Sequence, residues 1–176
     1  MLETRRLRLR AYRDVDLDPL VSMIGNWEVA RWLGQLPHPY GVADGREWIK
    51  FVQREHQGPQ PRRFAVALRE SDALIGGIGF VGAEVDGAAE IGYWLGQPHW
   101  GQGFGREAAA AIIDYGFREL SLQTIRAKTD PANFASQKVL LACGLEPSGE
   151  IGLERPTRHS GAMHALSFSL ARDRWR

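Results

Sequence analysis

The sequence predicts one α/β domain built around a mixed β-sheet, and three features of the chain lead to that fold class. Helical spacing of apolar residues dominates positions 14–56, strand-like alternation fills positions 64–95, and helices alternate with strands from position 104 onward. The chain has 176 residues, which is enough for one domain with its own core, and no repeat or linker divides it. We therefore expect residues 1–176 to fold as a single unit with helices on both faces of the sheet.

The first strand is expected in "RRLRLRAY", residues 5–12, because apolar and polar residues alternate strictly there. Leu7 and Leu9 point to one side of this strand, whereas the arginines and Tyr12 point to the other. The arginine side has two readings, a patch that binds an anionic ligand or a solvated strand face. A run of charges is usually a solvated face, and we adopt that interpretation.

Three helices are expected after this strand. Asp14 or Asp16 is a suitable N-cap for a first helix that ends near position 25, and Asn26 caps a short second helix in "NWEVARWL". The segment "LPHPYG" contains two prolines and a glycine, so it predicts a loop. Apolar residues at helical spacing then predict a longer helix over about residues 42–56.

Strand patterns replace helical ones over residues 64–95. The segments "RFAVALR", "ALIGGIGFVGAEV" and "AAEIGYWLG" are joined by the short turns "ESDA" and "DG", which predicts an antiparallel meander. A helix at about 104–119, a strand at "TIRAKTD" and a helix at "NFASQKVLLAC" come next, followed by a strand near Leu145 and a last strand at "AMHALSFSL". Because helices now separate the strands, we expect parallel pairing to enter the sheet.

Composition narrows the class of protein. The hydrophobic fraction of 44% and the charged fraction of 24% are ordinary for a globular protein outside a membrane. No apolar run approaches the ~20 residues that span a bilayer, and the first residues lack the apolar core of a signal peptide. The formal net charge of +1 gives no argument for nucleic-acid binding, and the single cysteine, Cys143, fits a reducing compartment. We therefore expect a cytoplasmic protein with no membrane and no nucleic-acid partner.

The most informative stretch is "HWGQGFGREAAAA", which places Gly101, Gly103 and Gly105 before a run of helix-forming alanines. Unpaired N–H groups and the dipole at a helix N-terminus favour phosphate, and glycines let a phosphate approach without meeting a Cβ. A P-loop needs Lys and then Ser or Thr where this chain has Arg106 and Glu107. A dinucleotide-binding loop needs G-x-G-x-x-G early in a βαβ unit. Both are disfavoured, which leaves another kind of diphosphate loop or a tight turn without a ligand.

Four segments together carry a resemblance to a known family. "WGQGFG", residues 100–105, resembles the acetyl-CoA diphosphate loop of the GNAT N-acyltransferase superfamily, although Trp100 stands where Gln or Arg is common. "EIGYWLG" resembles the central strand, and "TDPANFASQKVLLACGLEPSGE" resembles the later helix and strand, with Leu145 in place of a usual Phe. "LETRRLRLRAYRDVD" is similar to the start of the branch that acetylates N-terminal amines of ribosomal proteins. The resemblance covers about residues 3–170.

The resemblance implies a fold and a cofactor site. The fold is a mostly antiparallel sheet of six to seven strands with helices on both faces and a splayed central strand pair. The cosubstrate is acetyl-CoA, whose pantetheine arm runs along the backbone of Tyr93, Trp94 and Leu95. The residues expected around the diphosphate are Gly101, Gln102, Gly103, Phe104, Gly105 and Arg106.

Asn133, Ser136 and Lys138 on the later helix match positions that contact the rest of the cofactor. Each has an alternative reading. Asn133 is a good helix N-cap and Ser136 falls in the first helical turn, so both could serve the helix itself. Lys138 could reach the 3′-phosphate of the cofactor or be a solvated lysine.

The implied reaction is direct attack of a neutral amine on the thioester. Ser136 is the candidate that donates a hydrogen bond to the departing thiolate, and Glu90 is the candidate base, directly or through water. Strand alternation places Glu90 on the side of Trp94 and opposite Tyr93, so an ion-paired or solvent-facing glutamate is the competing reading. Tyr93 could serve as a phenolic acid, but an aromatic residue in a central strand is more often part of the core.

The amine acceptor is expected near the most individual segments of the chain. Trp27, Trp32, His38 and Tyr40 lie in "NWEVARWLGQLPHPY", and "ERPTRHSG" is expected across from them, although core packing is the competing reading for the aromatic residues. The five histidines show no metal-ligand spacing, so we expect no metal.

We therefore expect an acetyl-CoA-dependent N-acetyltransferase acting on a peptide or protein N-terminal amine. A small amine such as an amino acid, polyamine or aminoglycoside is one alternative acceptor. A non-catalytic acyl-CoA-binding module is another reading of the chain, and the resemblance adds the possibility of a homodimer.

Overall fold

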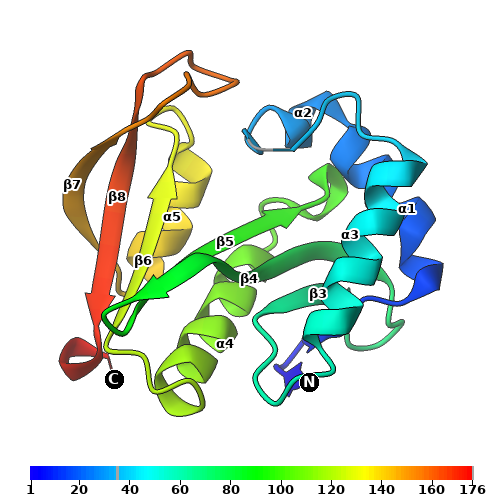
Figure 1. Ribbon diagram of the computed structural model, residues 1–176, viewed down its shortest axis with the longest axis horizontal. Helices are drawn as coiled ribbons and strands as arrows, with labels where there is room; N and C mark the ends of the chain where they lie inside the picture. Colours follow the sequence, from blue (N-terminus) through cyan, green and yellow to red (C-terminus); the bar gives the residue numbers. More distant parts are fainter. Residues whose placement is uncertain (35, 176) are drawn as a thin grey trace.

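The computed structural model describes residues 1–34 and 36–175, and its centre is one eight-stranded sheet in the order β1-β2-β3-β4-β5-β6-β8-β7 (Figure 1). The strands are β1 (Leu2–Glu3), β2 (Leu7–Arg10), β3 (Arg63–Leu68), β4 (Leu74–Val85), β5 (Ala88–Leu95), β6 (Thr124–Thr129), β7 (Glu146–Gly152) and β8 (His164–Ala171). The helices are α1 (Leu17–Gly25), α2 (Trp27–Ala30), α3 (Val42–Glu55), α4 (Phe104–Arg118) and α5 (Phe134–Ala142). No helix in these residues is long and apolar enough to cross a membrane.

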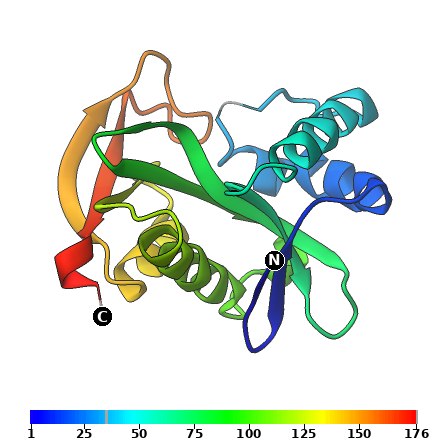
Figure 2. The same cartoon turned by 60° about the horizontal axis from the view of Figure 1, so that its bottom comes forward.

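Helices cover both faces of the sheet, as expected. The larger core cluster lies between the sheet and α4, and its fully buried members include Phe80, Ile112 and Phe117. A second cluster lies under α1 and α3 and includes Leu20 and Ile49. Figure 2 shows α4 on one side of the sheet and α1 and α3 on the other.

The element positions expected from the sequence are confirmed, and the sheet has one strand more than the six to seven expected. The additional strand is β1, which pairs Leu2 with Leu9 and Glu3 with Arg8 of β2. Two residues are too few for an alternating pattern to be recognised, so this strand could not be predicted from periodicity. All neighbouring strands are antiparallel except β5 and β6, which are parallel.

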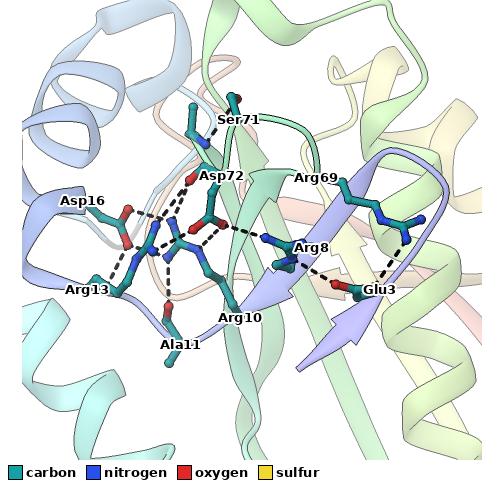
Figure 3. A network of polar contacts seen from close by, with 10 residues as sticks. Glu3, Arg8, Arg10, Ala11, Arg13, Asp16, Arg69, Ser71 and Asp72 are labelled. Atoms are coloured by element: carbon teal, nitrogen blue, oxygen red, sulfur yellow. Dashed lines mark hydrogen bonds and ion pairs between the residues drawn. The ribbon is translucent and has the colours of Figure 1, made fainter.

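The interpretation of the arginine side of β2 as a solvated face is wrong for Arg10 and Tyr12. Tyr12 is 2% exposed and belongs to the second core cluster, and Arg10 is 6% exposed. The guanidinium of Arg10 donates to Asp16 at 2.7 and 2.9 Å and to Oδ1 of Asp72 at 3.0 Å (Figure 3). The turn before α1 and the β3–β4 turn close over this strand, so the buried charge is neutralised by carboxylates from two distant segments.

The central parallel pair separates along its length. Cα pairing joins Ala88–Glu90 of β5 to Thr124–Arg126 of β6, yet β5 continues to Leu95 and β6 to Thr129 (Figure 1). On its other side β5 remains paired with β4 as far as Leu95. The expected splay is therefore present, and it leaves one backbone edge of β5 open beyond Glu90.

Candidate active site

The glycine loop has the backbone that its sequence requires. Gly101 and Gly103 have φ of +72° and +81°, and Gly103 is the N-cap of α4. Side chains rarely adopt this left-handed region, so glycine is needed at both positions. A Cβ at Gly101 would meet no protein atom within 4 Å. Glycine is therefore required there by the backbone angle and not by a steric clash.

The start of α4 is suited to an anion. Its N-cap is a glycine, which has no side chain to accept a hydrogen bond from the first-turn N–H groups. These N–H groups and the positive end of the helix dipole favour a diphosphate. The residues present therefore fit the diphosphate of acetyl-CoA at the start of α4, beside the open edge of β5.

The glycine loop is held from outside by the first residues of the chain, which the sequence analysis did not identify. Glu107 accepts hydrogen bonds from Thr4 Oγ1 at 2.6 Å, from the Arg6 backbone at 2.7 Å and from Arg6 Nε at 2.7 Å. Arg6 also donates to the Gln102 carbonyl at 3.0 Å, and its guanidinium lies 4.5 Å from the centre of the Phe104 ring. We call Thr4, Arg6 and Glu107 the loop brace.

The ionisation of Glu107 reflects this brace. Burial acts to raise the pKa of the Glu107 carboxyl, but the hydrogen bonds from Thr4 and Arg6 outweigh burial and lower that pKa. One sequence feature could have indicated this contact. The segment "TRR" at the start of the chain is complementary to the acidic residue in the first helical turn after the glycines. The alternating strand pattern alone placed the Arg6 side chain in solvent.

Two side chains fix the loop between β5 and α4. The indole N–H of Trp100 donates to the Leu95 carbonyl at 2.7 Å, and the Gln102 amide donates to the Pro98 carbonyl at 2.9 Å. Trp100, the residue that departs from the usual loop pattern, thus ties the loop to the end of the central strand. One lone pair of the Leu95 carbonyl is taken by this contact.

The residues on α5 lie against the splay. The Tyr93 hydroxyl is 3.0 Å from Ser136 Oγ, and the Asn133 side chain caps α5 by accepting from the Ser136 N–H at 3.1 Å. Burial raises the pKa of Tyr93 to about 12, so this phenol stays protonated at neutral pH. The structure thus brings Tyr93 and Ser136 together at the wall of the opening. Asn133 performs the capping role that competed with cofactor contact.

Glu90 lies on the opposite side of the sheet from Tyr93. It shares a face with Trp94, whose side chain packs against the second core cluster under α1 and α3. Its carboxylate is 3.3 Å from the ammonium of Lys128 on β6, and both side chains are partly exposed. Glu90 is therefore ion-paired in the structure, as the competing interpretation expected, and it lies where the pairing of β5 with β6 ends.

The aromatic residues expected at the acceptor mouth fall into three environments. Trp27 is 47% exposed with its ring 5.0 Å from that of His38, and the ring of Trp32 is 4.2 Å from that of His159. Tyr40 is 7% exposed and packs in the second core cluster, where burial raises its pKa to about 12. Trp27 and His38 are thus exposed and Trp32 is half-buried, whereas Tyr40 has the core environment that competed with acceptor contact.

The β7–β8 loop reaches across to these residues, as Figure 2 shows. Arg158 donates to the backbone carbonyls of Ala30 at 3.0 Å and of Leu36 at 2.5 Å. At its base the loop is held by Asp130, which accepts from Ser160 Oγ at 2.9 Å. Burial acts to raise the pKa of Asp130, but hydrogen bonds from Thr157, Ala132 and Ser160 lower it. Arg158 and Asp130 were not identified in the sequence, because both act over long sequence separations.

Two further candidates lie on outer surfaces. Arg106 in the first turn of α4 and Lys138 on α5 are both exposed. Within the described residues neither side chain has an ion-pair partner within 4.0 Å, so both cations are accessible to a negatively charged ligand. A Cβ at Gly105 would lie 3.6 Å from a methyl group of Val139 and 3.7 Å from one of Leu95, so the start of α4 lies close to α5 and to the end of β5.

This arrangement combines three chemical capacities. The start of α4 offers N–H donors to an anion, the open edge of β5 offers backbone groups to an extended arm, and Ser136 with Tyr93 offers hydroxyl groups beside that edge. Glu90 and Lys128 offer proton-transfer groups on the opposite face of the same opening. Such a site suits transfer of a group from a long phosphorylated carrier to an acceptor arriving from the side of α1 and α3.

Comparison with known proteins identifies the family. The model of the acetyltransferase (GNAT) domain matches residues 6–146. An uncharacterised N-acetyltransferase, p20, from Bacillus licheniformis is 37% identical over 149 residues, covering 84% of this chain and 83% of the relative. A ribosomal-protein-serine acetyltransferase from Escherichia coli is 32% identical over 143 residues, covering 78% of each.

A solved structure shows the same fold. Spermidine N-acetyltransferase from Vibrio cholerae, in complex with CoA and spermine, superposes with a TM-score of 0.78 at 21% identity, covering 97% of this chain and 98% of that one. GNAT enzymes use acetyl-CoA, and the site described above fits that carrier. The chain therefore belongs to the GNAT acetyltransferase family and is an acetyl-CoA-dependent N-acetyltransferase.

Proposed function

We propose that this enzyme transfers the acetyl group of acetyl-CoA to the N-terminal α-amine of a peptide or protein. The observation that carries the proposal is the separation of β5 and β6 beyond Glu90. The opening lies beside the start of α4, where no side chain caps the first-turn N–H groups. The diphosphate is assigned to the N–H groups of Gln102 through Arg106. The pantetheine arm is assigned to the open edge of β5 from Tyr93 to Leu95, between that edge and Asn133 on α5.

The transfer itself requires one bond to form and one to break. The neutral amine nitrogen forms a bond to the acetyl carbonyl carbon, the bond from that carbon to sulfur breaks, and the amine loses a proton while the thiolate departs. We assign proton acceptance from the amine to Glu90, through a water molecule. We assign hydrogen-bond donation to the departing sulfur to Ser136, with Tyr93 as the residue that positions the Ser136 hydroxyl.

An α-amine suits this site better than a lysine side chain. The pKa of a free α-amine is about 7.7–8.0, against about 10.4 for lysine, so a useful fraction is neutral at physiological pH without strong assistance. The relative from Escherichia coli is a ribosomal-protein-serine acetyltransferase, which supports this acceptor class. The spermidine enzyme from Vibrio cholerae represents the competing small-amine class on the same fold.

The test is thiol release from acetyl-CoA in the presence of a panel of short peptides, free amino acids, spermidine and an aminoglycoside. We expect turnover with peptides that carry a free N-terminus and none with the same peptides acetylated. Turnover confined to one small amine would replace the acceptor class. Binding of CoA without thiol release for any amine would instead support a non-catalytic binding module.

The roles are tested by Ser136→Ala and Glu90→Gln. Each is expected to lower kcat by about 100-fold or more, because a positioned general acid or base contributes roughly 10²–10⁴-fold. The affinity for CoA should stay within about twofold of wild type. Ser169→Ala on β8 and Glu47→Gln on the exposed side of α3 are matched controls that should leave kcat unchanged. Equal activity of Ser136→Ala and Ser169→Ala would remove Ser136 from the mechanism.

A further inference from the structure

We infer that Gly92 determines acceptor specificity, because it leaves space beside Glu90 for a branched carbon next to the amine, such as the α-carbon of a peptide's first residue. The inference rests on the proposed function, in which the amine reaches the thioester from the face of β5 that carries Glu90. It separates peptides from polyamines, whose primary amines stand on unbranched carbons.

The backbone at Gly92 does not itself require glycine. Gly92 lies inside β5 and is not among the glycines with a left-handed φ. It pairs directly with Gly79 of β4, and the register of these two strands shifts only further along, between Val81 and Val85. A glycine inside a strand lowers stability and marks a bulge, a tight bend, or the close approach of a ligand or another backbone. Because Gly92 shows neither a bulge nor a left-handed angle, a close neighbour is the reason that remains.

Two glycines of the adjacent strand β4 have that neighbour inside the protein. A Cβ at Gly77 would overlap the hydroxyl of Tyr12, which belongs to the second core cluster. A Cβ at Gly79 would lie 2.5 Å from the backbone carbonyl oxygen of Arg62. At both positions the protein itself fills the space that a side chain would need.

The space above Gly92 is filled only in part. Across residues 1–34 and 36–175, the only atoms within 4 Å of a Cβ placed at Gly92 are two methyl groups of Val81, at 3.1 and 3.7 Å. No backbone atom or aromatic ring lies there. Gly92 is partly exposed and Val81 is 36% exposed, so this position is accessible from solvent.

Gly92 is also the gap among the side chains that surround Glu90. Val81 faces Glu90 from β4, and Arg126 faces it from β6. Lys128, further along β6, contacts the carboxylate at 3.3 Å. Gly92 is two positions along β5 towards the open edge, at about 6.5 Å, and it lies on the same face as Glu90. Of these four neighbours, Gly92 alone presents no side chain to an incoming acceptor.

The shape of the acceptor follows from this gap. An amine on an unbranched carbon needs little space beside its nitrogen. The α-carbon of any residue except glycine carries both a carbonyl carbon and a side chain, so one more group must lie against the enzyme. We place that group over Gly92, in contact with the Val81 methyl groups. One carbon atom too many in such a contact changes kcat/KM by about 10–200-fold.

The experiment compares kcat/KM for two peptide amides that begin Ala-Ala and Gly-Ala and are otherwise identical, together with spermidine. Wild type should use the Ala-Ala peptide at least as well as the Gly-Ala peptide. Gly92→Ala should lower kcat/KM by about tenfold or more for the Ala-Ala peptide and by less than about threefold for the Gly-Ala peptide. Gly152→Ala at the end of β7, where a Cβ would meet nothing within 4 Å, is the matched control and should change neither value.

A double variant, Val81→Ala with Gly92→Ala, tests whether glycine is needed only for packing against Val81. Removing the valine methyl groups relieves the contact with the new Cβ, so this variant also guards against misfolding of the single one. The double variant should still discriminate against the Ala-Ala peptide. A return to the wild-type ratio between the peptides would overturn the inference.

Other outcomes separate the inference from the proposed function. Affinity for CoA should be unchanged in each variant, and its loss in Gly92→Ala would assign this glycine to the cofactor instead. Equal losses for both peptides in Gly92→Ala, or a wild-type preference for spermidine or the Gly-Ala peptide, would overturn the inference and leave acetyl transfer established. No thiol release with any amine would overturn the proposed function and the inference with it.

Discussion

The two halves of the sheet differ in how completely they are closed. From β2 to β4 each strand pairs along its length, helices cover both faces, and a charged residue as buried as Arg10 is neutralised by Asp16 and Asp72. From β5 to β7 the parallel ladder stops after three residue pairs, and every residue of the edge strand β7 is exposed. The enzyme thus combines a closed half, which supplies stability, with an open half, which supplies binding surface.

The comparison also shows where each kind of substitution should act. Changes in the closed half should reduce the free energy of unfolding and leave the chemistry of surviving molecules intact. Changes along the opening should reduce cofactor or acceptor binding at little cost in stability. Three predictions test this division, from the largest expected effect to the smallest.

The largest effect is expected for Arg10→Met in the closed half. Removing the guanidinium leaves the buried carboxylate of Asp16 without its main partner, which should lower the free energy of unfolding by about 3–5 kcal/mol. Urea denaturation followed by circular dichroism measures this change. Arg8→Met on the same strand breaks partly exposed ion pairs and should cost about 1 kcal/mol or less. Equal losses for the two variants would contradict the buried-pair argument.

The next effect is expected for Gly103→Val at the opening. A β-branched residue at φ +81° should cost about 1–2 kcal/mol of stability, and its side chain should obstruct the start of α4, reducing CoA affinity by about tenfold or more. Isothermal titration calorimetry with CoA gives the affinity. Gly82→Val in β4 is a matched control, since Gly82 has φ +71° and open space around it. Its stability should fall similarly while CoA affinity is retained.

The smallest effect concerns the loop brace and depends on pH. Because the folded-state pKa of Glu107 is lowered, its stabilisation is present above the unfolded value of about 4.3 and is lost as the pH falls through the folded value. Glu107→Gln should therefore reduce the free energy of unfolding by about 1–2 kcal/mol at pH 7, and the difference from wild type should shrink below about pH 4.

Urea titrations at pH 7 and pH 3 test this dependence. Glu47→Gln, on the exposed side of α3, should show no such convergence. A gap between wild type and Glu107→Gln that stays constant from pH 7 to pH 3 would mean that the charge of Glu107 does not stabilise the brace.

Local pattern was enough to predict most of the fold and part of the site. Asn26 caps α2 as expected, with its side chain accepting from the Glu28 N–H, and the glycine loop precedes α4 where helix-forming residues begin. These features depend on residues a few positions apart, which periodicity and capping rules describe. The family resemblance supplied the splay between β5 and β6.

What could not be predicted depends on which distant segments meet. Arg10 contacts Asp72 across 62 positions, and Arg158 reaches Ala30 across 128. An alternating strand pattern shows that two faces differ, but it cannot show that a turn from another part of the chain will cover the polar face. Arg10 was therefore assigned to solvent, and Arg158 was not singled out.

The loop brace has a consequence for how this enzyme is handled and assembled. It links Arg6 to Glu107, 101 positions later, so the conformation of the glycine loop depends on residues from the start of the chain. Contacts between residues so far apart in sequence are expected to form late in folding, because a long loop of chain must close before they can be made. Under the proposed cofactor assignment, affinity for CoA should report on the integrity of the first residues, so a purification tag is better attached to the C-terminus than to the N-terminus.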